Sequence, residues 1–152
     1  AEMAGLADGE DIAAALTLMT QPQDTAARIL HEAHAMTDVT GFGLAGHLLG
    51  LCGGAGGAGP LGGEAVPGMQ GAAELAERGI RSSLYPENRA VLPDLPAGGR
   101  HDLLFDPQTA GGLLAAVAPE RAEQIRDALG AAGYPAAIIG KLSEGAAGVS
   151  LA

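Results

Sequence analysis

Apolar side chains recur at helical spacing in the two outer parts of the chain. Ile12, Leu16 and Met19 occupy positions i, i+4 and i+7, which puts them on one face and predicts a helix over residues 10–19. Residues 119–132 carry a similar stripe between a proline and a glycine, the residue types that favour a helix start and a helix end. The same reasoning predicts further helices over residues 22–33, 44–52 and 70–77.

Short apolar runs between glycine, proline and polar clusters predict strands. Near the end of the chain, such runs over residues 113–117, 136–142 and 148–151 surround the 119–132 helix in a β-α-β-β order. That order favours a mixed sheet with helices packed on its faces, so the predicted fold class is α+β or α/β. Two earlier strands are expected over residues 35–39 and 101–105.

Between these elements the composition predicts irregular structure. Residues 53–63 are almost entirely Gly and Ala, with too few large apolar side chains to order themselves, and predict a flexible surface loop. Residues 60–66 are a weak strand candidate. Prolines recur between residues 86 and 96, so we expect at most one helical turn there, over residues 88–92.

Length and charge narrow the class of protein. The length fits a single domain over residues 1–152, with a core of Leu, Ile, Val and Ala. The formal net charge of −10 disfavours nucleic acid and anionic membranes as partners, because both would repel the chain. No apolar run is long enough to span a bilayer, and the first residues lack the basic start of a signal peptide. A cytoplasmic protein is expected.

A few single side chains invite a functional interpretation. Cys52 is the only cysteine, which excludes an internal disulfide and predicts a buried thiol on the 44–52 helix. His31 and His34 could bind a metal from one helix face, but no third ligand is near in sequence, so a packing or solvated role is preferred. Arg81 could face phosphate or another anion, although pairing with an acidic side chain is the preferred interpretation.

The chemistry of the chain is concentrated around Asp38. This residue ends an extended segment, and a glycine-rich turn over residues 41–46 follows it. Glycines let the backbone approach an anion closely, and a helix start offers N–H groups to it. A carboxylate at such a turn can hold a divalent cation that bridges to phosphate oxygens. Because Lys141 is the only lysine, magnesium or basic groups of another domain must balance the charge of a nucleotide such as ATP.

Two other interpretations of this turn are open. One is a glycine turn that serves packing alone. The other is a dinucleotide fingerprint, since Gly41, Gly43 and Gly46 have the spacing G-x-G-x-x-G. The fingerprint is disfavoured because it should open directly from a buried apolar strand, whereas Asp38 and two threonines come before the first glycine.

A second polar turn lies at residues 106–112. Asp106 can accept hydrogen bonds from the backbone ahead of it, and the proline that follows fixes φ. Gly111 and Gly112 allow a tight return into the 113–117 strand. Taken alone, this segment is explained equally well as an ordinary turn.

Two segments carry a resemblance to a known family. Residues 37–44 read Thr-Asp-Val-Thr-Gly-Phe-Gly-Leu, with Gly-His-Leu at residues 46–48, and residues 104–114 read Leu-Phe-Asp-Pro-Gln-Thr-Ala-Gly-Gly-Leu-Leu. Both are similar to segments of the selenide, water dikinase (selenophosphate synthetase) family of the AIR synthetase-like superfamily. Ala110 stands where many members have Ser. We call residues 37–44 the first motif and residues 104–114 the second motif.

The resemblance implies an AIR synthetase C-terminal domain-like fold with partial ferredoxin-like β-α-β topology. It implies that the chain lacks the first strand of that domain and the N-terminal ATP-binding domain, its expected partner, which carries the catalytic residues. The intact family, expected to be homodimeric, uses ATP and Mg²⁺ to phosphorylate selenide, releasing AMP and phosphate. The chain alone is expected to be inactive and to contain no catalytic residue.

The resemblance also assigns residues to a site, by position in the motifs. Asp38 becomes the magnesium ligand of this half of the site. Residues of the first motif are expected near ATP or phosphate: Thr37, Thr40, Gly41 and Gly43. Residues of the second motif are expected near the same site: Asp106, Gln108, Thr109, Gly111 and Gly112.

Two other functions remain open. A stand-alone nucleotide- or protein-binding module of the same fold would bind its partner tightly without help. Another ATP-dependent enzyme of the superfamily, such as a small-molecule kinase, is disfavoured by the presence of both motifs.

Overall fold

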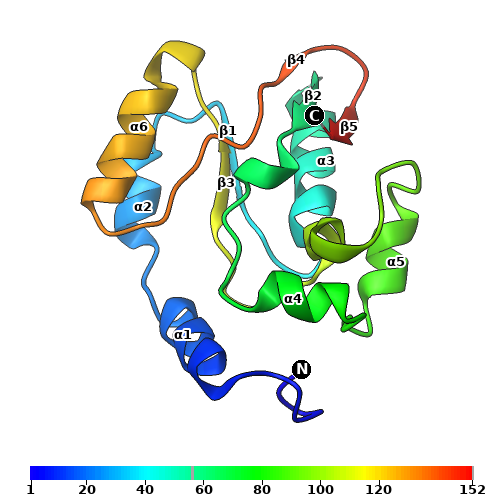
Figure 1. Ribbon diagram of the computed structural model, residues 1–152. Coiled ribbons are helices and arrows are strands. Elements are labelled where there is room, and N and C mark those ends of the chain that lie inside the picture. The colour runs from blue at the N-terminus through cyan, green and yellow to red at the C-terminus, as the bar shows by residue number, and fades with distance from the viewer. Residues whose placement is uncertain (56, 152) are drawn as a thin grey trace.

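The computed structural model describes residues 1–55 and 57–151. Figure 1 shows a mixed α/β domain in which helices surround small sheets. The helices are α1 (Gly9–Met19), α2 (Asp24–Ile29), α3 (Gly43–Ala55), α4 (Ala72–Glu77), α5 (Tyr85–Ala90) and α6 (Pro119–Ala131), with the 3₁₀ helices η1 (Gly63–Ala65) and η2 (Gly99–Phe105). The strands are β1 (Ala35–Asp38), β2 (Gly57–Leu61), β3 (Leu113–Ala116), β4 (Ser143–Glu144) and β5 (Gly148–Leu151).

The predicted helices are confirmed, although their ends differ. The carboxylate of Asp8 accepts a hydrogen bond from the amide of Glu10 at 2.8 Å and so caps the start of α1. Pro119 occupies the first turn of α6, as predicted. The helix expected over residues 22–33 shortens to α2. The prediction of at most one helical turn over residues 88–92 is wrong, because the six-residue helix α5 starts at Tyr85 with a proline in its first turn. Within the described residues, no helix combines the length and apolarity that a bilayer span requires.

The first sheet joins the two motifs. β1 and β3 pair antiparallel, with Asp38 opposite Leu113 and Ala35 opposite Ala116. This confirms the strands expected over residues 35–39 and 113–117, each one residue shorter than predicted. The ladder brings the end of β1 and the start of β3 to one place, which is where the polar turns of both motifs lie (Figure 1).

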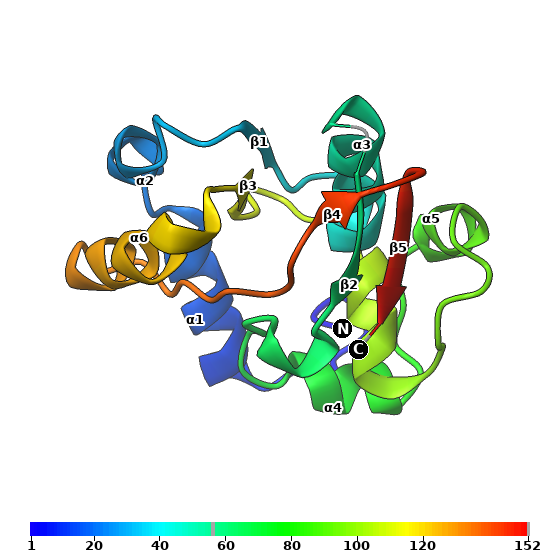
Figure 2. The ribbon, with the colours of Figure 1, turned by 90° about the horizontal axis from the view of Figure 1, so that it is seen from above.

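The second sheet overturns the prediction of a flexible loop over residues 53–63. In that segment β2 pairs parallel with β5 and antiparallel with β4 (Figure 2), while residue 56 lies outside the described residues. Glycine permits the close approach of the neighbouring chain, because a Cβ built on Gly59 would lie 2.3 Å from the carbonyl oxygen of Lys141. The small residues therefore serve the packing of a strand.

Two strand predictions in the second half of the chain are wrong. Residues 101–105 belong to η2, because a short apolar run suits a buried helical turn as well as a strand. Residues 136–142 contribute only an isolated bridge, from Gly140 to Leu61, before β4 begins. The β-α-β-β run therefore divides between two sheets, and the expected single mixed sheet does not form.

The core lies between α3, η2 and the sheets. Phe105 is fully buried. The Tyr85 ring meets the Phe105 ring edge-on, with 6.3 Å between the ring centroids, and the Arg89 guanidinium lies 4.9 Å from the centroid of the Phe105 ring. Cys52 is also fully buried, which confirms its predicted role and raises the pKa of its thiol. The buried cluster comprises Val39, Ala45, Leu48, Cys52, Leu61, Leu95, Leu104, Phe105 and Leu114.

Candidate functional site

The two motifs lie side by side and are joined by backbone hydrogen bonds beyond the β1–β3 ladder. The amide of Val39 donates to the carbonyl of Gly112 at 2.9 Å. The amide of Gln108 donates to the carbonyl of Thr40 at 3.0 Å. Since backbone bonds of this kind fix the relative positions of both segments, the turns that follow Asp38 and precede Leu113 form one structural unit.

Glycines allow this close contact at two positions. Gly43 has a φ of 67°, and a Cβ there would lie 2.8 Å from the carbonyl oxygen of Leu104. A Cβ on Gly111 would lie 2.1 Å from the carbonyl oxygen of Val39. Both glycines are thus required by contact between the motifs. Gly41, in contrast, is exposed, and a Cβ there would meet no atom within 4 Å.

His47 holds the first motif from α3. Its Nε2 accepts a hydrogen bond from the amide of Thr40 at 3.0 Å and lies 3.1 Å from the Thr40 hydroxyl oxygen. Because a backbone N–H can only donate, Nε2 is the acceptor and the ring proton belongs on Nδ1. The sequence assigned no role to His47, although its place in the Gly-His-Leu segment that follows the first motif was the available signal.

Asp38 is exposed at the end of β1. The hydroxyl of Thr37 donates to the Asp38 backbone carbonyl at 3.1 Å, and the exposed Gly41 follows three residues later in the chain. Carboxylates and hydroxyls are oxygen ligands of the kind that Mg²⁺ prefers. The oxygen donors at the end of β1 are therefore of a chemical type that fits magnesium.

In the second motif, Asp106 is partly buried while Thr109 is exposed. Burial raises the pKa of the Asp106 carboxyl, and the positive charges of the N-terminal amino group and Arg81 only partly oppose that shift. The side-chain amide of Gln108 donates through Nε2 to the Asp106 carbonyl at 3.3 Å. Ala110 has a φ of 50°, a conformation uncommon outside glycine. This turn therefore holds a carboxylate whose ionisation a nearby cation would favour.

The structure gives little support for a metal site outside the two motifs. Within residues 1–55 and 57–151, no group of three or more His, Cys, Asp or Glu side chains could hold a metal ion. His31 and His34 are both exposed, and Nδ1 of His31 lies 2.9 Å from the carbonyl of Arg28. Within this part of the chain, Asp38 is thus not grouped with two further His, Cys, Asp or Glu side chains.

Arg81 belongs to a buried ion-pair cluster. It pairs with Asp102, which also accepts hydrogen bonds from the Tyr85 hydroxyl and, at 2.9 Å, from the amide of Gly98. Burial raises the pKa of Asp102, but these hydrogen bonds and the charge of Arg81 outweigh it and hold the pKa below its ordinary value. The preferred pairing of Arg81 with an acid is confirmed, although that acid is buried.

An open groove of about 770 Å³ lies beside the first motif. Apolar side chains border it, and Phe42 and Val91 are 66% and 54% exposed. Exposed large apolar side chains gathered at one groove are typical of a surface that another protein segment covers.

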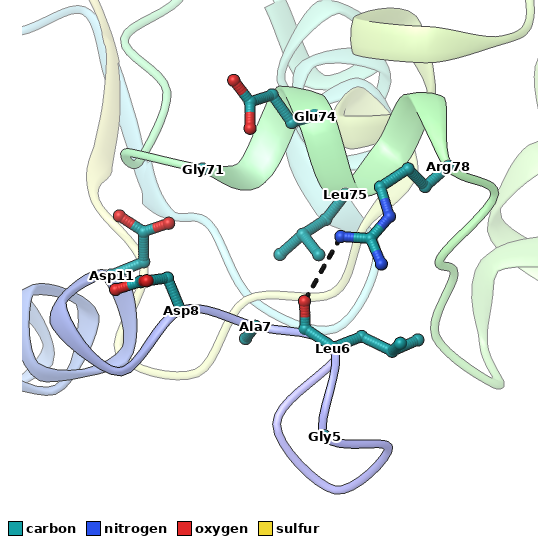
Figure 3. A pocket seen from close by; sticks show the side chains of 9 residues that line it. All are labelled: Gly5, Leu6, Ala7, Asp8, Asp11, Gly71, Glu74, Leu75 and Arg78. Atoms are coloured by element: carbon teal, nitrogen blue, oxygen red, sulfur yellow. Dashed lines mark hydrogen bonds between the residues drawn. The ribbon is translucent and has the colours of Figure 1, made fainter.

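A second hollow, of about 300 Å³, lies between the N-terminal segment and α4 (Figure 3). Asp8, Asp11 and Glu74 contribute carboxylates to it, and Arg78 donates to the carbonyl of Leu6 at 3.4 Å. All of these residues are outside both motifs, so this hollow is distinct from the candidate site.

Comparison with known proteins identifies the class. The family model of AIR synthase related proteins, C-terminal domain, matches residues 2–151, and the chain belongs to this family. Similar proteins carry a more specific name. "Selenide, water dikinase" of Dechloromonas aromatica (strain RCB) is 36% identical over 129 residues, 80% of this chain and 37% of the relative. The protein of that name from Rhizobium meliloti (strain 1021) is 40% identical over 127 residues, 79% of this chain and 36% of the relative.

The same name belongs to a protein of Escherichia coli (strain K12), 41% identical over 112 residues, 71% of this chain and 32% of the relative. The resemblance inferred from the two motifs is therefore confirmed: the family model matches the chain, and similar proteins are named selenide, water dikinase. The chain spans about a third of the length of the curated relatives it matches.

Proposed function

We propose that this chain acts as the C-terminal domain of a selenide, water dikinase and completes its Mg-ATP site. The similarity to proteins of that name over most of the chain supports the reaction class. The observation that carries the site is the junction of the two motifs, with the exposed Asp38 carboxylate at its edge. In the proposed reaction, ATP, selenide and water yield selenophosphate, AMP and orthophosphate.

In this proposal Asp38 supplies one oxygen ligand to Mg²⁺, and the metal when bound neutralises phosphate charge. The exposed Gly41 leaves room for a phosphate group to reach the backbone. Thr37 and Thr40 add hydroxyls at the same edge, and the second motif adds the Asp106 carboxyl. The residues of this chain therefore bind and orient the phosphate end of ATP, while the reacting groups come from elsewhere.

An N-terminal domain is the proposed partner. Mg²⁺ keeps its waters unless several anionic ligands displace them, and one exposed carboxylate is a weak site. The net charge of −10 also repels ATP, so basic groups from another domain are needed to hold it. The apolar groove beside the first motif is where we expect that domain to dock. We accordingly expect little activity from the chain alone.

The test is reconstitution. The chain is combined with the N-terminal part of a selenide, water dikinase, and selenide-dependent AMP release is measured. Asp38→Asn should abolish turnover, while the matched variant Asp94→Asn, at another exposed aspartate, should retain it. Normal turnover by Asp38→Asn would remove Asp38 from the mechanism. Tight binding of Mg-ATP by the chain alone, measured by calorimetry, would instead favour a stand-alone binding module.

A further inference from the structure

Asn88 connects the two motifs from outside both. It is the only asparagine of the chain, lies in α5 and is 9% exposed. Its Nδ2 donates to the carbonyl of Gly41 at 2.8 Å and to the carbonyl of Phe105 at 3.0 Å. Gly41 belongs to the first motif and Phe105 to the second. One side-chain amide group therefore bridges the two segments.

The chemistry of this bridge is specific to an amide. Both partners are carbonyl oxygens, which only accept, so the NH₂ group and not the oxygen of Asn88 must face them. An NH₂ group has two N–H donors, one for each carbonyl. Aspartate has the same shape and, when ionised, no donor, while serine has a single donor on a shorter side chain.

The helix that carries Asn88 is held in place on both sides of it. The Tyr85 hydroxyl donates to the buried Asp102 of η2, and the Arg89 guanidinium lies 4.9 Å from the centroid of the Phe105 ring. Arg89 also donates to the carbonyls of Leu92 and Leu95. Because α5 is anchored to η2 in this way, the Asn88 amide is a fixed point against which the glycine turn is positioned.

The bridge sets the direction of one peptide group. In a planar trans peptide the C=O and the following N–H point to opposite sides. The Gly41 carbonyl points at Asn88, so the backbone N–H of Phe42 points away from Asn88. A backbone N–H in that direction is a donor that a phosphate oxygen can use.

We propose that Asn88 is a positioning residue of the Mg-phosphate site. It holds the Gly41 carbonyl inward, so that the Phe42 amide is presented to a bound phosphate and the glycine turn keeps its place against the second motif. The proposal rests on the proposed function for the identity of the ligand, whereas the bridge itself is independent of it.

The first experiment tests the bridge in the chain as it is, by amide hydrogen exchange. Asn88→Asp removes the donors without changing shape, and Asn88→Ala removes them without adding charge. Gln124→Glu makes the same amide-to-acid change at an exposed site on α6 and is the control. Exchange of the Val39 and Gln108 amides, which join the motifs, should be about tenfold faster in both Asn88 variants.

Exchange at the Gly62 amide, which donates to Ile139 in the other sheet region, serves as the internal reference for global unfolding. The Gln124→Glu control should leave all three amides unchanged. If the Val39 and Gln108 amides of both Asn88 variants exchange no faster relative to Gly62 than in the parent chain, the bridge does not hold the motifs together and the proposal is overturned.

The second experiment tests positioning in the reconstituted enzyme, below the melting temperature of each variant. Loss of a supporting hydrogen bond should raise the KM for ATP about tenfold in both Asn88 variants, and a purely structural role would lower the melting temperature alone. An unchanged KM, with Asp38→Asn inactive, overturns the role of Asn88 and leaves the proposed function standing. Full turnover by Asp38→Asn overturns the proposed function, and with it the ligand assigned here.

Discussion

Two aspartates of this chain occupy opposite environments. Asp102 is buried and is satisfied within the domain by Arg81, Tyr85 and the Gly98 amide. Asp38 is exposed at the end of β1, beside a backbone turn that is fixed by hydrogen bonds and glycine contacts. The charge of Asp102 is therefore used to stabilise the fold, whereas the charge of Asp38 lies at the surface, where we propose that a ligand binds it. Stability and activity should therefore respond to different substitutions.

The largest effect on stability is expected at Asp102. Asp102→Ala leaves Arg81 without its buried partner, and losing one member of a buried pair costs about 3–5 kcal/mol of unfolding free energy. Asp38→Asn, at an exposed position, should change it by less than about 0.5 kcal/mol. Urea unfolding of both variants measures the two changes in unfolding free energy. Similar losses of free energy in the two variants would contradict the contrast between Asp102 and Asp38.

The same cluster predicts a response to acid. Folding lowers the pKa of Asp102 below the ordinary value of 3.8, so its stabilising contribution is complete above that pH. The contribution is lost as the pH falls from 3.8 through the lower folded pKa, because the carboxyl must then be protonated. Asp102→Ala should flatten this part of the stability profile.

An intermediate effect is expected at the contact between the motifs. Gly111→Ala places a Cβ 2.1 Å from the Val39 carbonyl oxygen, and overpacking of this kind costs about 1–3 kcal/mol. The matched variant Gly112→Ala meets no atom within 4 Å and should change the unfolding free energy by less than about 0.5 kcal/mol. Thermal unfolding of the pair provides the measurement. Equal melting temperatures would mean that the motifs do not need their close contact.

An effect smaller than that of Gly111→Ala, and of the opposite sign, is expected at Asp106. Folding raises the pKa of this carboxyl above 3.8, so its ionisation opposes folding. That cost is absent below pH 3.8, grows as the pH rises through the folded pKa and is complete above it. Asp106→Asn should therefore raise the unfolding free energy at neutral pH, by less than about 1 kcal/mol, and leave it unchanged in acid.

This result would make Asp106 intermediate between the buried, paired Asp102 and the exposed Asp38. A carboxylate that destabilises the fold is typical of a site that binds a positively charged ligand. Unfolding at pH 7 and at pH 3 would check the sign. A variant less stable than the parent chain at pH 7 would show that Asp106 serves the fold, as Asp102 does.

Local sequence patterns were sufficient to predict the structure of segments that are stabilised by contacts between neighbours in the chain. The stripe of apolar residues in α1, the proline at the start of α6 and the glycine turn after Asp38 all appear as expected. The two motifs were also enough to indicate their family. Which of these side chains bind metal and phosphate is still a prediction.

Contacts between segments distant in sequence determined the structural features that local patterns did not predict. The small residues over 57–61 became β2 because they pair with β4 and β5, and at Gly59 the chain near Lys141 leaves no room for a Cβ. No local pattern records those neighbours. The apolar run of η2 carried no signal to distinguish it from a strand. Asp102 and Asn88 acquired their roles from partners far away in sequence, 21 residues for Arg81 and 47 for Gly41.

The sequence by itself thus determined the helices with clear periodicity, the paired strands of the motifs and the family to which they belong. Only the tertiary structure decided that Gly43 and Gly111 serve contact between the motifs while Gly41 is exposed. The physical reason is that a residue's burial and hydrogen-bond partners depend on which segments meet in space. Local structural propensity does not encode those tertiary contacts.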